Sequence, residues 1–421
     1  MNTEYERKLE QYAEVIVKVG LNVQPGQRVL IGPPLLFVYG VSPELAPLVR
    51  QITKMAYQQG ASFVDVIWDD PQLRLLRLQH APAESAAEFA TWPYEEARRY
   101  AENGDAVLFI YAQSPDLLDG QNPDTVSALQ QLAFQHSGAT WNLVGEGAFN
   151  WSMISAPVEG WTEKLFPDLP PDEARSRFWE VIFEISRITG DQPVAGWQRH
   201  IQQLAKLGDT MNSKRYASLH YRAPGTDLTI GLPGGHVWNS GALTTQQDIA
   251  FVANIPTEEV FTLSHRQQVE GIVTATKTLS YEGTLIENFT LTFEYGQVVK
   301  ATADRGETQL NRMLDTDAGA RRLGEVALVP HSSPISQTGL LFHNILIDEN
   351  AANHLALGQA YKFTMQDGTG MSDEAFTAAG GNLSLIHTDF MIGSGAMDVD
   401  GIRDDGTSEP VLRAGEWAFE V

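Results

Sequence analysis

Histidine and carboxylate residues lie close together in the second half of the sequence, and one pair has a spacing that suits metal binding. His387 and Asp389 belong to the apolar run Leu383–Ile392, which is typical of a buried strand. Alternate residues of a strand point to the same face, so the imidazole and the carboxylate would lie about 7 Å apart along one side. They could bind one ion or two adjacent ions, or form a His–Asp hydrogen bond within the core. The pair alone leaves both interpretations open.

A second pair, Glu349 and His354, has a less favourable spacing. We expect Asn350 to cap a short helix that ends at Gly358. Five residues along a regular helix correspond to a rotation of about 140°, so the two side chains could share a site only if Glu349 precedes the helix. Taken singly, Glu349 would be a solvated carboxylate and His354 a hydrogen-bonded core residue.

Three further glutamates lie beside predicted strands. Glu258 and Glu259 precede one strand, and Glu325 opens another within Leu323–Pro330. Burying a carboxylate is costly unless a cation or several hydrogen bonds accompany it, and lysine and arginine are scarce around these segments. A metal ion is therefore a plausible counter-charge. Adjacent residues of an extended segment point in opposite directions, so we expect only one of Glu258 and Glu259 to bind it.

The donor set indicates which ions such a site would take. Carboxylates and imidazoles without thiolates suit Zn, Co or Mn, whereas an all-oxygen set would suit Mg or Ca. Four carboxylates and two histidines are more than a single tetrahedral ion can use. The number suits two ions that share a bridging carboxylate, with a water between them. The spacing of these residues alone does not establish that they form such a two-ion site.

The first half of the sequence predicts an α/β domain with a mainly parallel sheet, over residues 1–190. Short apolar segments alternate with helical patterns, and a helix is expected to begin at Pro43 with Ser42 as its cap. The expected strands are Arg28–Ile31, Phe63–Trp68, Ala106–Tyr111 and Trp141–Val144.

After the Thr189–Pro193 segment, extended segments separated by Gly/Pro turns predominate. A hairpin is expected around Tyr295-Gly296, and a strand over Tyr361–Met365. These features predict that residues 191–421 form a β-rich α+β domain that carries the catalytic, metal-binding residues.

Composition excludes several classes of function. The 421 residues include 29 Lys and Arg against 53 Asp and Glu, a net charge of -24 that disfavours binding to nucleic acid or an anionic membrane surface. There is no cysteine, which excludes disulfides, thiolate nucleophiles, zinc fingers and iron–sulfur clusters. The charged N-terminus does not resemble a signal peptide, and no apolar run reaches the roughly 20 residues of a membrane span. We therefore predict a cytoplasmic location.

Several familiar site motifs are absent. The sequence contains neither His-Glu-x-x-His nor a P-loop, and Gly145–Asn150 lacks the third glycine of a dinucleotide-binding motif. Gly393-Ser394-Gly395 is not a nucleophile elbow. The α/β half is therefore expected to be a scaffold rather than a nucleotide site.

A series of short motifs resembles the aminopeptidase T / aminopeptidase S (aminopeptidase II) family of metallopeptidases. Their order and density across residues 250 to 420 make the resemblance specific, whereas the first 200 residues match more loosely. The motifs are Asn254–Thr262, Glu270–Val273, Thr284–Phe289, Leu323–Ala327, Ser333–Ser336, Asp348–Ala351, His354–Gly358 and His387–Gly393.

The resemblance implies a cytoplasmic, homodimeric aminopeptidase that binds two divalent metal ions and removes N-terminal residues from short peptides. It places the family's tyrosine of the active site at Tyr361 and the metal-bridging carboxylate at Glu325. The metal positions implied for this sequence are Glu259, Glu325, Glu349, His354, His387 and Asp389.

The expected chemistry is metal-assisted peptide hydrolysis, in which the phenol of Tyr361 donates a hydrogen bond to the oxyanion and Glu258 is a candidate general base. The sequence departs from the family pattern at His343, where an aromatic residue is more usual, and at Leu35–Glu44, which resembles an insertion. Two alternatives stay open. One is another dinuclear metallohydrolase, such as an amidase or a phosphoesterase, and the other is a non-catalytic protein that binds peptides or metal.

Overall fold

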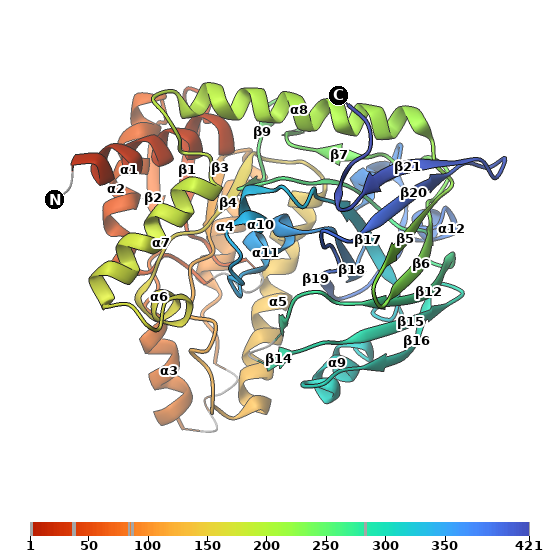
Figure 1. Cartoon of the computed structure of the whole chain (residues 1–421). Helices are drawn as coiled ribbons and strands as arrows, with labels where there is room; N and C mark the ends of the chain where they lie inside the picture. Colours follow the sequence, from red (N-terminus) through yellow and green to blue (C-terminus); the bar gives the residue numbers. More distant parts are fainter. Residues whose placement is uncertain (1–2, 36–38, 83–84, 86–87, 282–283, 421) are drawn as a thin grey trace. The chain divides into compact units, whose positions relative to one another are not determined.

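The chain folds into two compact units (Figure 1). The computed structural model describes residues 3–35, 39–82, 85, 88–281 and 284–420. The first unit comprises Met1–His200 and Ala242–Pro256, and the second comprises Ile201–Gly241 and Thr257–Val421. The chain thus leaves the first unit, returns to it for a short segment and then completes the second.

The first unit contains a five-stranded sheet in the order β10-β4-β3-β1-β2, in which every pair of neighbours is parallel. Its strands are β1 (Arg28–Ile31), β2 (Phe63–Val66), β3 (Ala106–Ile110), β4 (Trp151–Ile154) and β10 (Asn254–Ile255). All five residues of β3 are buried, as expected for a central strand of a parallel sheet covered by helices.

Helices connect these strands, as the alternating pattern of the sequence predicts. The principal helices are α1 (Thr3–Val15), α2 (Ala46–Gln58), α3 (Pro71–His80), α4 (Trp92–Glu102), α5 (Pro123–Gly145), α6 (Glu159–Leu165) and α7 (Pro171–Ile185). The last helix of this series, α8 (Pro193–Lys214), begins in the first unit and ends in the second.

Local signals in the first unit are partly confirmed. Ser42 accepts a hydrogen bond from the backbone N–H of Glu44 and caps the short helix η2 (Pro43–Leu45), as predicted. The strand expected at Trp141–Val144 is wrong, because these residues form the last turns of α5. A short apolar run fits a buried helix as well as a strand, and here the helix packs against α4. Residues 36–38 of the Leu35–Glu44 stretch lie outside the described residues.

The second unit is built mainly from two large antiparallel sheets, and it also contains a two-stranded antiparallel sheet of β13 (Leu279–Tyr281) and β14 (Thr284–Ile286). One has eight strands in the order β16-β15-β12-β6-β5-β20-β21-β22. These are β5 (Ser218–Ala223), β6 (Thr226–Gly231), β12 (Val269–Thr274), β15 (Thr290–Glu294), β16 (Gln297–Thr302), β20 (Asp398–Ile402), β21 (Ser408–Arg413) and β22 (Glu416–Trp417). The predicted hairpin around Tyr295-Gly296 is confirmed, since it joins β15 to β16.

The other sheet has five strands in the order β19-β18-β17-β11-β7. Its strands are β7 (Asn239–Ser240), β11 (Val260–Thr262), β17 (Leu323–Leu328), β18 (His354–Gly358) and β19 (His387–Met391). One buried apolar cluster contains residues of both sheets, among them Tyr221 and Phe293 from the eight-stranded sheet and Val326, Leu355 and Phe390 from the five-stranded one. The two sheets therefore share one core.

Two predictions about the second half are wrong. The helix expected from Asn350 to Gly358 is not formed: Asn350 lies in a short 3-10 turn, and His354–Gly358 form β18, which pairs with β17 and β19 on its two sides. The strand expected at Tyr361–Met365 is a short 3-10 helix, η5 (Lys362–Thr364). At the coarser level the sequence-based fold class is confirmed, because the chain is an α/β protein with a parallel sheet and several antiparallel sheets. Within the described part of the chain, no helix combines the length and apolar character that a bilayer span needs.

Candidate metal centre

The ladder of the five-stranded sheet brings four of the predicted ligands to one face. Glu325 of β17 lies opposite Ala356 of β18, and Ala356 lies opposite Asp389 of β19. Directly opposed residues of an antiparallel ladder share a face, as do alternate residues of one strand. His354 and His387, each two positions from one of these residues, therefore lie on the same face. We call this side of the sheet the ligand face.

Small residues fill the positions between the histidines and carboxylates of the ligand face. Ala327 lies opposite His354, and Gly358 lies opposite His387. Gly358 has a φ of 104°, and a Cβ atom there would lie 2.1 Å from the carbonyl oxygen of Ile386, so only glycine fits. These short side chains leave room for the longer functional ones to converge.

Five side chains contribute to two overlapping groups of potential ligand atoms, with Glu325 common to both. One group contains Glu259, Glu325 and His354, and the other contains Glu325, His387 and Asp389; within each group the atoms lie within 4.8 Å of one another. Nε2 of His354 lies 3.2 Å from Oε2 of Glu259 and 3.5 Å from Oε1 of Glu325. Nε2 of His387 lies 3.8 Å from Oε2 of Glu325 and 3.6 Å from Oδ1 of Asp389. The two oxygens of Glu325 thus face one histidine each.

Backbone carbonyls fix the orientation of both imidazoles. Nδ1 of His354 donates to the carbonyl oxygen of Ala352 at 3.1 Å, and Nδ1 of His387 donates to that of Gln359 at 2.7 Å. A carbonyl can only accept, so each Nδ1 carries the proton and each Nε2 points at carboxylate oxygens. In a neutral imidazole this nitrogen carries a lone pair, so a cation or a proton must lie between it and the oxygens. Hydrogen bonding through the other ring nitrogen is the arrangement typical of histidine metal ligands.

Two carboxylate oxygens in the groups are buried without a satisfactory hydrogen bond. These are Oε2 of Glu259 and Oδ1 of Asp389, in residues whose exposed fractions are 8% and 6%. Leaving a buried charged oxygen unsatisfied is costly. Since carboxylates and imidazoles also form a suitable donor set, the residues present fit a divalent metal ion of the Zn, Co or Mn type.

The electrostatics of the site favour added positive charge. Burial raises the pKa of Glu325, and burial together with Asp389 and Glu259 raises the pKa of Glu349 well above its usual value. Burial opposes protonation of His354, but the nearby carboxylates of Glu259 and Glu325 raise its pKa well above the usual value. Similarly, the negative charges of Asp389 and Glu325 outweigh burial and raise the pKa of His387 to about 9. Even if both histidines were protonated, their two positive charges would not balance the negative charges of the four nearby carboxylates.

Glu349 lies beside both groups without belonging to either. It is the first residue of the 3-10 turn η4 (Glu349–Ala351), which follows α11 (Ile345–Asp348), and it is buried. It interacts electrostatically with Asp389, Glu259 and His354. The helical separation argued from the sequence does not apply, because His354 begins a strand and the chain turns between the two residues.

Glu258 and Tyr361, the two predicted catalytic residues, also lie outside the two groups. Glu258 precedes β11 and is buried, and its backbone N–H donates to Oδ1 of Asn350 at 2.8 Å. The ring of Tyr361 lies 4.6 Å from that of His387 and stacks on Phe363 at 5.2 Å. Burial and then the nearby carboxylates, Glu325 first, raise the pKa of Tyr361 well above its usual value, so its phenol stays protonated.

His343, noted as a departure from the family pattern, is not brought into either group. It has a φ of 56° and sits in a turn that Asp348 holds by accepting hydrogen bonds from the N–H groups of Phe342 and Asn344. Asp348 and Asn350 are two polar residues near the site to which the sequence assigned no role there; Asn350 was expected only to cap a helix. Their contacts depend on tertiary structure, and only the run of polar residues at 348–350 hinted at them.

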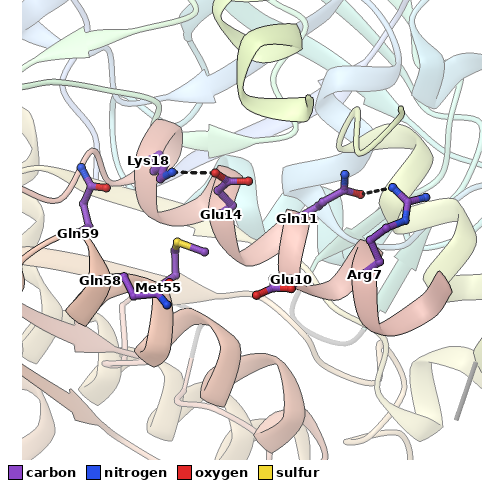
Figure 2. Close-up of a pocket in the computed structure, with 8 residues that line it drawn as sticks. All are labelled: Arg7, Glu10, Gln11, Glu14, Lys18, Met55, Gln58 and Gln59. Carbon is purple, nitrogen blue, oxygen red and sulfur yellow. Dashed lines mark hydrogen bonds and ion pairs between the residues drawn. The ribbon is translucent and has the colours of Figure 1, made fainter. Parts of the chain in front are cut away.

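A surface pocket in the first unit offers no comparable chemistry. It has a volume of about 410 Å³ and lies along α1 and α2, with Met55 and polar side chains at its walls (Figure 2). Its charged groups pair locally, as in the 2.7 Å contact between Lys18 and Glu14 and the bond from Arg7 to Gln11. Such an open, internally paired surface is not a catalytic site.

Comparison with known proteins decides the family. The model of a family described as thermophilic metalloprotease (M29) matches residues 5–417. The chain belongs to the M29 metalloprotease family. Aminopeptidase 2 of Geobacillus stearothermophilus is 46% identical, with 99% of each chain covered. Aminopeptidase T of Thermus thermophilus is 42% identical over 98% of this chain and 99% of the relative.

A solved structure agrees with this assignment. Wild-type AmpT from Thermus thermophilus matches with a TM-score of 0.91 and 41% identity, over 99% of this chain and 100% of that one. The family resemblance and the enzyme class predicted from the sequence, a metallo-aminopeptidase, are confirmed. In this M29 member, the carboxylate–histidine groups are the part of the described chain suited to bind the divalent metal that the family implies.

Proposed function

We propose that this M29 enzyme removes N-terminal residues from short peptides at a site for two divalent metal ions, Zn, Co or Mn. The proposed ligands are Glu259, Glu325, Glu349, His354, His387 and Asp389. One observation carries the two-ion proposal: the two oxygens of Glu325 face two different histidines, 3.5 Å from one and 3.8 Å from the other. A carboxylate so placed can bridge two ions.

Each protein group has a defined task in this proposal. Two bound divalent ions would polarise the scissile carbonyl and lower the pKa of a water molecule towards neutrality. The carbonyl oxygens of Ala352 and Gln359 hold His354 and His387 with Nε2 directed into the site. Tyr361, protonated at neutral pH, would donate a hydrogen bond from its phenol to the oxyanion that develops on the substrate. Glu258 is proposed as the general base because it is buried directly beside Glu259.

The charge of the site supports recognition of a free amino terminus. A substrate α-ammonium group would enter a region that holds four buried carboxylates. Acetylation removes both its charge and its basic lone pair. The eight proposed site residues all belong to the second compact unit, which supports a catalytic domain within residues 191–421 and a scaffold that contains residues 1–190; residues 191–200 and 242–256 belong to the first unit. The homodimer and the cytoplasmic location rest on the sequence alone.

The decisive experiment compares matched substrates. Purified protein, loaded with Zn, Co or Mn, is assayed on aminoacyl anilides, on di- and tripeptides and on their N-acetylated forms, with products followed by mass spectrometry. Free peptides should lose one residue at a time from the N-terminus. Acetylation should lower kcat/KM by a factor of several tens or more, because leaving a buried polar group without its partner costs about 2–3 kcal/mol.

Other products would point to the alternatives. Efficient cleavage of acetylated substrates or internal bonds would indicate an amidase or endopeptidase, and hydrolysis of phosphate esters a phosphoesterase. Metal binding without any hydrolysis would favour a binding protein. The net charge of -24 makes nucleic acid an unsuitable ligand in all of these cases.

A further inference from the structure

Asn350 links two segments that carry proposed metal ligands. Its side chain is fully buried, with an exposed fraction of 0%. Oδ1 accepts a hydrogen bond from the backbone N–H of Glu258 at 2.8 Å, across 92 positions of sequence. Nδ2 donates to Oε1 of Glu349 at 3.3 Å and to the carbonyl oxygen of Leu346 at 3.1 Å. One amide thus contacts the segment that leads into Glu259 and the carboxylate of Glu349.

The segment that Asn350 contacts, Glu258-Glu259, is not itself part of a strand ladder. β11 begins at Val260, so Glu258 and Glu259 lie just before the first ladder pair, Val260 with Leu328. On the other side, Glu349 sits on a single 3-10 turn. The backbone carbonyl of Asn350 in turn accepts a bond from the hydroxyl of Ser333 at 2.8 Å, which anchors the turn to a third segment. Asn350 therefore ties together parts of the chain that the sheet does not hold in register.

The chemistry of asparagine suits this position. Its amide is acceptor and donor at once, whereas aspartate has no donor when ionised and serine is too short to reach both groups. The amide is also neutral. It orients the carboxylate of Glu349 without supplying a positive charge that would compete with a cation for the same oxygen atoms.

We propose that Asn350 is a positioning residue, which fixes Glu259 and Glu349 relative to each other and so sets the geometry of the two-ion site. This inference rests on the proposed function, in which both glutamates bind metal. Groups that hydrogen-bond to metal ligands from outside typically change metal affinity by 10–100-fold when they are removed.

The test measures metal binding to the folded apoprotein. Asn350→Ala should bind Zn 10–100-fold more weakly than wild type in a competition titration against a chromophoric chelator, and should have a lower kcat at saturating metal. Asn150→Ala is the matched control. Asn150 is equally buried and also uses one acceptor and one donor, with Gln27 Nε2 at 2.8 Å and the carbonyl oxygen of Leu21 at 2.6 Å. Among the described residues its side chain forms no hydrogen bond with a carboxylate, so its alanine variant should lose thermal stability but keep wild-type metal affinity in the folded protein.

Asn350→Ser provides a milder variant in case the alanine variant does not fold. Its hydroxyl can satisfy one of the two groups at most, so the folded serine variant should still bind Zn at least about tenfold more weakly than wild type. Folded Asn350 variants with wild-type affinity for both ions would overturn the positioning role. If wild-type protein itself binds fewer than two ions in the same titration, the two-ion proposal fails instead, and the two failures are thereby distinguished.

Discussion

The two faces of the five-stranded sheet are formed by alternate residues of the same strands, but one face packs into the apolar core and the other carries the proposed metal ligands. Along β18, Leu355 and Leu357 belong to the apolar core, while His354, Ala356 and Gly358 lie on the ligand face. The neighbouring strands repeat this division. Both faces are buried, so the difference lies in chemistry rather than in exposure to solvent.

This comparison shows how a rigid support and a charged site can share one element. Apolar burial on the core face stabilises the strands by about 25 cal/mol per Å². On the other face the same strands carry buried carboxylates, which lower stability unless they are compensated. If the faces are separable, substitutions on one should change folding and substitutions on the other should change metal binding and catalysis.

The largest effect is expected from Glu325→Gln on the ligand face. Glutamine keeps the shape of the side chain but removes the negative charge that we propose bridges two ions. Metal affinity should fall by more than the roughly 100-fold seen when outer partners are removed, and activity should be lost. Elemental analysis and kcat measurements check this. Two tightly bound ions and normal turnover in the variant would show that Glu325 is not the bridge.

On the core face, Leu355→Ala should do the reverse. Leu355 is fully buried, and replacing such a leucine by alanine typically lowers the free energy of unfolding by about 2–5 kcal/mol. Denaturant unfolding of the apoprotein should show this loss. Well below the unfolding midpoint, the variant should still bind metal with wild-type stoichiometry. Loss of metal from the folded variant would mean that the two faces are not separable.

Sequence periodicity was sufficient to predict one strand that contributes to the ligand face, but it was misleading for another. His387 and Asp389 alternate with apolar residues, so a strand and a shared face could be predicted, and β19 confirms both. The segment from His354 to Gly358 is a central strand buried on both sides, which leaves no alternation of polar and apolar residues to recognise. The chain length from Asn350 to Gly358 and the capping residue then suggested a helix.

Other features of the site depend on contacts that no local pattern carries. Extended geometry indicated that only one of Glu258 and Glu259 would point into the site, and the choice of Glu259 came from the family resemblance. The bond from Glu258 to Asn350 spans 92 positions, so its role could not be read from either segment. In the first unit, Trp141–Val144 has apolar residues that suit a strand, but packing against α4 stabilises the helix there.

Tyr361→Phe tests the catalytic chemistry next to the ligand face without altering the strands. The variant keeps the ring that contacts His387 and Phe363 and removes only the hydroxyl. Loss of one oxyanion donor typically lowers kcat by about 10²–10³-fold, and metal affinity should not change. Tyr221→Phe is the control, because Tyr221 is a buried tyrosine of the other sheet whose hydroxyl has no hydrogen-bond partner within the described structure. Equal activities of the two variants would make Tyr361 a packing residue.

The smallest effect on metal affinity is expected from a substitution that only fills space on the ligand face. Ala356 lies opposite both Glu325 and Asp389, so Ala356→Val would add two methyl groups among the converging carboxylates. Valine suits a strand, and we expect the fold to persist with a metal affinity about tenfold lower, equivalent to about 1.4 kcal/mol.

Val326→Ile is the control for Ala356→Val. It adds a methyl group to the core face of the neighbouring strand, where overpacking typically costs about 1–3 kcal/mol of stability. That control should unfold more easily while binding metal normally. If Ala356→Val changed stability but left metal affinity unaltered, the small residues of the ligand face would be there for packing, and the space between Glu325 and Asp389 would not be part of the site.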